Sequence, residues 1–222
     1  MNRNKKWLYA GLLGIMSVLF TVLVRVADVA PIGPEGTKVG FSHINKAVFD
    51  LTGFNGTFYD LTTWLGYAVL LVAFVFAAAG LVQAVRRKSV LKVDREILVL
   101  GGLYVLLALV YVFFEKVVIN YRTVIMPGCE HPEASYPSSH TMLVCVIMGS
   151  AMMLMKKYVR DEKTRGILRV VCAAVIAVMV IGRLLAGVHW LTDIIGGLLI
   201  SAALLELYAA LITDPARKDG KE

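Results

Sequence analysis

A histidine and an aspartate four residues apart are the first residues of this sequence that suggest chemistry. If His189 and Asp193 lay on one helix they would share a face. The carboxylate could then accept a hydrogen bond from one imidazole nitrogen and leave the other nitrogen as a nucleophile or base. Arg183 comes six residues before His189, and a helix break near Gly187 would let its guanidinium fold over the same site. Taken alone, the pair is equally consistent with a hydrogen bond at a helix end.

A second polar stretch precedes a long apolar run. Pro137, Ser138, Ser139 and His140 read as the start of a helix, which Ser138 or Ser139 would cap. Free amide groups and the positive end of the helix dipole would make this start an anion site, with hydroxyls and an imidazole beside it. The alternative is a plain helix cap next to a surface histidine, and for this stretch in isolation that alternative is the better one.

Lys116 and Arg122 add two cations shortly before this stretch, although such residues also occur as interfacial anchors whose long stems snorkel. The combined set holds three cations, two histidines, one orienting carboxylate and a helix start. Phosphoryl transfer needs these parts: charge neutralisation on the equatorial oxygens, an in-line nucleophile and an acid for the leaving oxygen. Arginine suits the grip because its planar fork matches two phosphate oxygens. No arrangement of Cys and His or of paired carboxylates suggests a metal, and no cofactor is expected.

The elements that must position these residues are membrane helices. The chain has 222 residues, 58% of them hydrophobic, and a mean hydropathy of +0.72, which is far above that of a soluble domain. A bilayer core needs about 20 apolar residues per helix. We expect one all-α membrane domain over residues 1–222, with six spans near 7–27, 61–85, 97–115, 138–156, 168–188 and 193–213. The basic start resembles a signal peptide, but the first apolar run is too long and lacks a cleavage pattern, so we expect a retained helix.

Basic residues cluster in alternate segments, and this orients the protein. Seventeen of the 23 basic residues lie in four segments: before the first span, after the second, after the fourth and in the tail. They are Arg3, Lys5 and Lys6; Arg86, Arg87, Lys88, Lys92 and Arg95; Lys156, Lys157, Arg160, Lys163, Arg165 and Arg169; and Arg217, Lys218 and Lys221. Both termini should therefore be cytoplasmic, and both polar stretches should face outward. The net charge of +7 is then a topology signal and not a nucleic-acid footprint.

The outer segment from residue 28 to residue 60 is the longest loop. Ile44, Val48 and Leu51 follow helical spacing within it, which predicts a short helix on the outer membrane surface. An ordinary belt of aromatic anchors explains the segment equally well. Of the three cysteines, Cys145 and Cys172 fall inside predicted spans as packing residues and Cys129 stands alone outside, so no internal disulfide is expected.

At its polar stretches the sequence resembles the type 2 phosphatidic acid phosphatase superfamily, which includes bacterial lipid phosphatases and the vanadium haloperoxidases. The third family motif, Ser-Arg-x5-His-x3-Asp, matches at 182–193 with Gly182 in place of Ser. The second, Pro-Ser-Gly-His, matches at 137–140 with Ser139 in place of Gly. In the first, Lys-x6-Arg-Pro, Arg122 fits but Thr123 replaces Pro, and Glu115 stands where the motif has Lys. Lys116 is one residue out of register, a rotation of about 100° on a helix.

The resemblance implies roles for these residues. His189 would be the nucleophile that forms a phosphohistidine, Asp193 would orient it, and His140 would protonate the leaving oxygen and then activate water. The phosphate would be clamped by Arg122, Arg183, Lys116, Ser138 and the amide of Ser139. The implied activity is a metal-independent lipid phosphate phosphatase in a bacterial-type inner membrane, with its active site on the extracytoplasmic side.

The resemblance leaves the substrate open. Undecaprenyl pyrophosphate fits the outer side and the small size of the chain best, and phosphatidylglycerophosphate, phosphatidate and lipid A phosphates remain. The only expected partner is the lipid phosphate itself; nucleic acid is not expected, and the sequence does not give the oligomeric state. Two other classes stay open, a lipid transporter with a polar outer vestibule and a family member that binds lipid phosphate without turnover.

Overall fold

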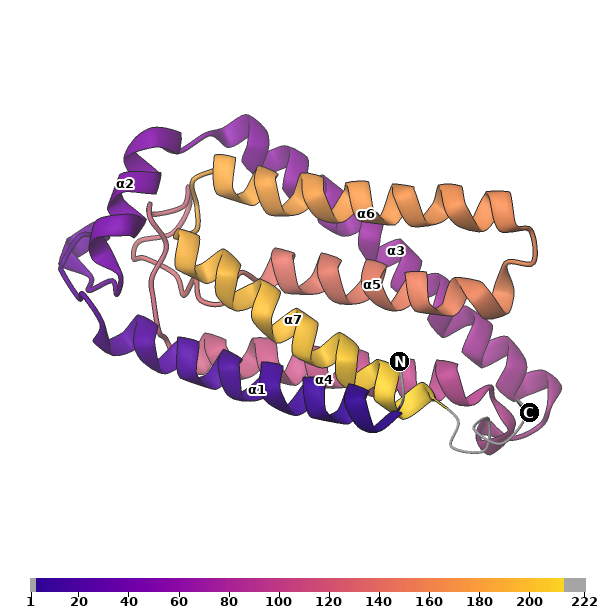
Figure 1. The fold of residues 1–222 in the computed structure, drawn as a ribbon. Helices are drawn as coiled ribbons and strands as arrows, with labels where there is room; N and C mark the ends of the chain where they lie inside the picture. Colours follow the sequence, from indigo (N-terminus) through magenta and orange to yellow (C-terminus); the bar gives the residue numbers. More distant parts are fainter. Residues whose placement is uncertain (1–2, 214–222) are drawn as a thin grey trace.

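The chain forms a bundle of long helices. The computed structural model describes residues 3–213, and in that range it contains seven α-helices and no strand (Figure 1). They are α1 (Arg3–Val26), α2 (Ser42–Thr52), α3 (Gly56–Arg86), α4 (Arg95–Lys116), α5 (Ser139–Tyr158), α6 (Glu162–Leu185) and α7 (Leu191–Ile212). All except α2 are long and apolar enough to cross a membrane. The prediction of six spans in an all-α protein is confirmed.

The helices begin and end differently from the apolar runs. Helix α3 begins five residues before the predicted span because the side chain of Asn55 caps it, accepting a hydrogen bond from the amide of Phe58 at 3.2 Å. Helix α6 begins at Glu162 because Asp161 caps it in the same way, and it ends at Leu185, three residues short of the prediction. Hydropathy marks the part of a helix that suits an apolar layer, whereas polar caps mark its ends. The basic tail residues Arg217, Lys218 and Lys221 lie outside the described residues.

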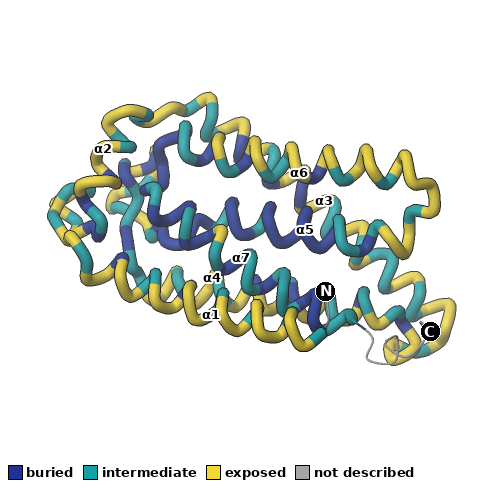
Figure 2. The backbone as a smooth tube through the Cα atoms, viewed as in Figure 1, coloured by how far each residue is buried: buried dark blue, intermediate teal, exposed yellow. Residues whose placement is uncertain are grey.

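Helices α5 and α7 form the centre of the bundle. In the most apolar 18-residue stretch of each span, 67% of α5 and 50% of α7 are buried inside the protein, against 22% or less in the other four spans (Figure 2). Helix α1 packs along α7, α6 packs on α5, and α3 crosses both α5 and α6. Large apolar side chains such as Trp64 and Val170 remain exposed on the outer helices, as expected for surfaces that face lipid.

One end of the bundle carries α2, the segment 117–138 and the turn between α6 and α7 (Figure 1). The predicted short helix in the first outer loop is therefore present as α2. Its polar residues Ser42 and Asn45 are buried against the bundle, while Ile44 and Leu51 are exposed. An exposed apolar face is consistent with a helix that lies on a membrane surface, and this placement, like the cytoplasmic position of both termini, stays a prediction.

The turn between α6 and α7 is fixed by close packing. The amide of Asn55 donates to the carbonyl of Ala186 at 3.0 Å, so the start of α3 lies directly against this turn. Gly187 adopts a φ of +62°, and a Cβ there would collide with the carbonyl of Gly53. Only glycine satisfies both conditions without strain. The chain can therefore leave α6 and enter α7 within five residues, which holds the ends of the two helices together.

Candidate active site

Arg183 and His189 meet inside the protein at the turn between α6 and α7. Arg183 lies in the last turn of α6 and is fully buried, and one of its terminal nitrogens, Nη2, lies 3.3 Å from Nε2 of His189. Its other terminal nitrogen, Nη1, donates to the hydroxyl of Thr62 at 3.3 Å, and the guanidinium carbon lies 5.2 Å from the ring centre of Tyr59. The predicted break near Gly187 is present, and it brings the arginine onto the histidine.

His189 is a neutral base in this setting. It lies in the loop before α7 and is only 4% exposed, and burial, followed by the charges of Arg183 and Arg122, holds its pKa well below the ordinary value of 6.5. Because an arginine can only donate, the contact with Arg183 places an unprotonated lone pair on Nε2. A neutral imidazole with an unprotonated ring nitrogen is the form that can attack an electrophile.

Asp193 lies on the other side of the imidazole. Its Oδ2 atom is 3.7 Å from Nδ1 of His189, which is longer than a hydrogen bond. The two residues do not share a helix, because α7 begins at Leu191, after His189, so the condition for a shared helical face is not met. The carboxylate is instead held by two other donors: Oδ1 accepts from Asn120 at 2.9 Å and Oδ2 accepts from the amide of Trp190 at 3.0 Å. Asp193 thereby caps α7 while facing the histidine.

Buried amides and hydroxyls that the sequence reasoning missed hold the start of α7. Asn120 is 1% exposed and donates to Asp193. Asn45 of α2 donates to the hydroxyl of Thr192 at 2.9 Å, and its side-chain oxygen accepts from the backbone amide of Thr192 at 3.2 Å. The hydroxyl of Thr123 donates to the carbonyl of Gly187. Residues from α2 and from the 117–138 segment therefore position the histidine and its aspartate. No spacing rule marks these residues; a polar side chain near the predicted motif residues is the only signal.

His140 enters the site from the first turn of α5. Gly66 of α3 leaves room for its ring, since a Cβ at that position would lie 3.1 Å from Cδ2 of His140. The prediction that Ser138 or Ser139 caps α5 through its side chain is only half right. Ser138 stands at the cap position, but its hydroxyl accepts from Thr141 at 3.0 Å and makes no bond to the helix amides. Ser138 is fully buried, and Ser139, not Ser138, borders the cavity beside His140.

Arg122 lies across the site on the segment after α4. Its side chain is 16% exposed, and Nε lies 3.1 Å from a carboxylate oxygen of Glu133, whose side chain is 47% exposed. The amide of Arg122 also donates to the carbonyl of Glu133 at 2.9 Å, so side chain and backbone are held by the same partner. Arg122 is thus brought together with both histidines, but it is already paired with a carboxylate.

Lys116 is not brought to the site. It is the last residue of α4, it is exposed, and it does not border the cavity that Arg122, His140 and His189 share. Glu115, one residue earlier, does border that cavity. The one-residue shift seen in the sequence therefore has its expected geometric result, and a carboxylate stands where the family motif has an ammonium.

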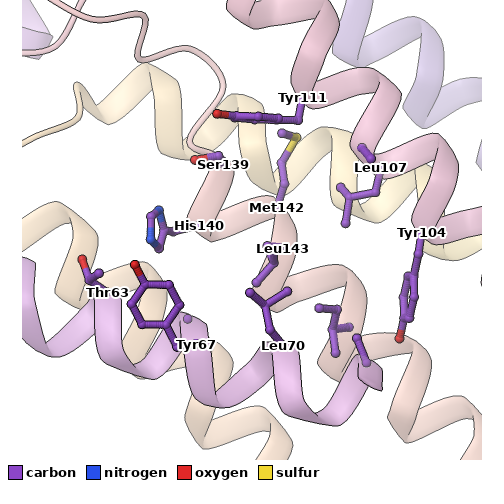
Figure 3. Close-up of a pocket in the computed structure, with 14 residues that line it drawn as sticks. Thr63, Tyr67, Leu70, Tyr104, Leu107, Tyr111, Ser139, His140, Met142 and Leu143 are labelled. Atoms are coloured by element: carbon purple, nitrogen blue, oxygen red, sulfur yellow. The ribbon is translucent and has the colours of Figure 1, made fainter. Parts of the chain in front are cut away.

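Two hollows meet at His140. A polar cavity of 180 Å³ is bordered by Glu115, Arg122, Glu133, Ser139, His140 and His189, among others. An apolar groove of 430 Å³ runs between α3, α4 and α5, and Figure 3 shows Tyr67 and Thr63 near His140 with Leu70, Leu107 and Tyr104 farther along. Tyr111, Ser139, His140 and Met142 border both hollows. An anionic group in the cavity could therefore be attached to an apolar chain in the groove.

The three cysteines are free, and Cys145 and Cys172 are buried as predicted. In residues 3–213, no group of three or more His, Cys, Asp or Glu side chains is arranged to hold a metal ion. The polar cavity is bordered by the imidazoles of His140 and His189 and by the guanidinium of Arg122, and Arg183 contacts His189 from behind.

Comparison with known proteins identifies the family and the fold. No curated protein sequence matches the chain. Its fold resembles the crystal structure of a transmembrane PAP2-type phosphatidylglycerolphosphate phosphatase from Bacillus subtilis, with a TM-score of 0.66 and 15% identity over 96% of this chain and 99% of that chain. At this identity the likeness shows a shared fold. A family model described as the PAP2 superfamily matches residues 68–216, which include all the candidate site residues predicted from the sequence. The chain is a multi-pass membrane protein that belongs to the PAP2 superfamily, and this membership makes it a hydrolase of phosphoester bonds.

Proposed function

We propose that this protein is a metal-independent lipid phosphatase that works through a phosphohistidine at His189. The observation that carries the proposal is that His140 borders both a polar cavity with His189 and Arg122 and an apolar groove between α3, α4 and α5. A lipid phosphate has this combination of a charged head and an apolar tail. The groove would hold the chain, the cavity would hold the phosphate, and the bond to be broken would pass beside His140.

The proposed reaction uses the groups in the order in which they meet the phosphate. Phosphate oxygens would replace Nε2 of His189 as the acceptors of the Arg183 N–H groups, which leaves the Nε2 lone pair free to attack phosphorus. The leaving oxygen would take a proton from His140 and depart with the lipid. Water, deprotonated by His140, would then attack the phosphohistidine and release inorganic phosphate and neutral His189. Asp193 would orient the imidazole through Nδ1, and the arginines would stabilise the charge on the equatorial oxygens.

We further propose that the site faces the extracytoplasmic side of a bacterial-type cell membrane. The site lies at one end of the bundle, and residues 3 and 213 lie at the opposite end (Figure 1). Of the 23 basic residues, 17 belong either to segments at this opposite end or to the tail outside the described residues. The positive-inside rule places such segments in the cytoplasm. The substrate would then be an outer-leaflet lipid, and the whole chain would act as one domain.

The lipid itself is the finer part of the proposal. Undecaprenyl pyrophosphate is the first expectation from sequence, and phosphatidylglycerophosphate gains support because the structural neighbour is described as a phosphatase for it. Phosphatidate and lipid A phosphates complete the set. A phosphate-release panel with these lipids in detergent micelles would rank them by kcat/KM.

The same panel tests the reaction class. Phosphate release should persist in EDTA and should be inhibited by vanadate, which mimics the trigonal bipyramidal phosphorus of the transition state. Loss of release in EDTA with recovery in a divalent metal would contradict the metal-independent route. A transporter or a binder without turnover would bind lipid phosphate but release none.

A further inference from the structure

The polar cavity contains more negative than positive charge. Of the side chains that border it, Glu115 and Glu133 are carboxylates and Arg122 is the one cation. Arg183 does not border the cavity, because its guanidinium lies against His189, Thr62 and the Tyr59 ring; in the proposed reaction it meets the phosphate only from the His189 side. A site that must accept a phosphate thus presents two carboxylates to it, and this needs an explanation in terms of the substrate.

The two carboxylates differ in their partners. Glu133 is paired with Arg122 at 3.1 Å, so those two charges largely cancel. Glu115 has no ion pair within residues 3–213, and its neighbour Lys116 does not border the cavity. Glu115 is therefore an uncompensated negative charge at the edge of the phosphate site.

The position of Glu115 relates it to a particular part of a bound lipid. Tyr111, four residues earlier on α4 and on the same face of the helix, borders both the cavity and the groove. Glu115 borders only the cavity. Its carboxylate therefore stands beside the boundary between the two hollows, where the atoms that link an apolar chain to its phosphate must pass.

A phosphomonoester carries nearly two negative charges at neutral pH, and a pyrophosphate carries more, so an unpaired carboxylate at this boundary repels either one. A positive group on the link between chain and phosphate would turn this repulsion into attraction. We propose that Glu115 makes the site selective for lipid phosphomonoesters that carry an ammonium group within a few bonds of the phosphorus. This inference rests on the proposed lipid phosphatase function and narrows its substrate class.

A pair of nearly isosteric substrates tests the inference. One is a long-chain 2-aminoalkyl phosphate and the other is its 2-hydroxyalkyl twin, which keeps the chain and the phosphate but lacks the positive charge. Both are presented to the full chain in detergent micelles near pH 7, in EDTA, and phosphate release gives kcat/KM for each. We expect kcat/KM to be about fivefold higher for the ammonium twin, the size of one partly exposed charge pair.

Variants of Glu115 then assign the preference to this residue. Glu115→Gln should bring the ratio of the two kcat/KM values to about one, and Glu115→Lys should reverse it. Glu130→Gln and Glu130→Lys are the matched controls, because Glu130 is an exposed carboxylate of the segment after α4 and borders neither hollow. Both controls should keep the ratio of the unmodified chain.

The outcomes separate the two proposals. Phosphate release at equal rates from both twins, or a preference that survives Glu115→Gln, overturns the inference and leaves the lipid phosphatase function standing. No release from any lipid phosphate overturns the function itself, and the inference with it. If added Mg²⁺ raises kcat/KM for the hydroxyl twin in the unmodified chain but not in Glu115→Gln, the carboxylate recruits a metal ion and the inference is wrong.

Discussion

The candidate site has an enclosed half and an open half, and the protein holds them very differently. In the enclosed half, Arg183, His189 and Asp193 are each less than 5% exposed, and Asp193 accepts hydrogen bonds from two donors. In the open half, Arg122 is tied to a half-exposed glutamate, and Lys116 and Glu115 are exposed at the end of α4. The comparison teaches that the proposed reacting groups are preorganised by burial and hydrogen bonds, whereas the groups at the rim are held by fewer partners.

The largest effect should come from the enclosed half. His189→Ala removes the proposed nucleophile, so phosphate release should fall by more than about 10⁴-fold. The measurement is phosphate release at saturating lipid, with a thermal melt in detergent as the check on folding. A folded variant with a near-normal rate would exclude His189 as the nucleophile.

Asn120→Ala probes the support of the enclosed half. The variant leaves Oδ1 of Asp193 without its donor. Because a hydrogen bond to a charged group contributes substantially to stability, its loss should lower kcat by about 10- to 100-fold with little change in KM. Asn55→Ala is the matched control, because that amide caps α3 and its loss should cost about 1 kcal/mol of stability without changing kcat. Equal kcat values in the two variants would mean that Asn120 only stabilises the fold.

The pH dependence of stability offers a third test of the enclosed half. Burial lowers the pKa of His189 in the folded protein, so the folded state binds fewer protons than the unfolded state below pH 6.5. Stability should therefore fall as the pH drops below 6.5, by up to about 1.4 kcal/mol per pH unit, until the lowered pKa of the folded state is reached. Melting temperatures of the native chain and of His189→Gln from pH 7 downward check this, and parallel curves would show that His189 is not the cause.

In the open half, Glu133→Gln should strengthen anion binding, whereas the changes in the enclosed half weaken activity or stability, and its effect should be smaller. The change releases Arg122 from its 3.1 Å contact, and the freed guanidinium can then turn to an anion. Because the pair is partly exposed, the expected gain is at most about fivefold, seen as a lower inhibition constant for vanadate. Weaker inhibition would mean that Glu133 orients Arg122 for the phosphate.

The smallest effect should follow the removal of Lys116. Because its side chain is exposed and away from the cavity, Lys116→Ala should change kcat/KM by less than about twofold. Arg122→Ala, which removes the cation that does border the cavity, should lower kcat/KM by at least about tenfold. Similar losses in the two variants would show that both cations contact the phosphate.

The sequence predicts the helical framework well and the site in part. Six apolar runs determine the spans because a membrane requires length and hydropathy that local composition reveals. The approach of Arg183 to His189 follows from a short spacing broken by Gly187, which is also local. Asn120, Asn45 and Thr123 could not be predicted, because their partners lie far away in the chain and become neighbours only after folding.

The position of His189 outside α7 has a physical origin as well. A spacing of four residues gives a shared face only where both residues lie on one helix. Asp193 instead accepts a hydrogen bond from the amide of Trp190 and caps α7, which therefore begins after the histidine. The replacement of Lys by Glu at position 115 was visible in the sequence, yet only the fold shows that this side chain borders the cavity and that of Lys116 does not.

The junction of the two hollows at His140 has a consequence for the kinetics of the proposed reaction. The two products would leave into different phases, the dephosphorylated lipid sideways through the groove into the bilayer and the phosphate through the cavity into water. Inhibition by the lipid product would then depend on its mole fraction in the membrane, and inhibition by phosphate on its bulk concentration. Diluting the membrane with inert lipid would relieve one form of inhibition and leave the other unchanged.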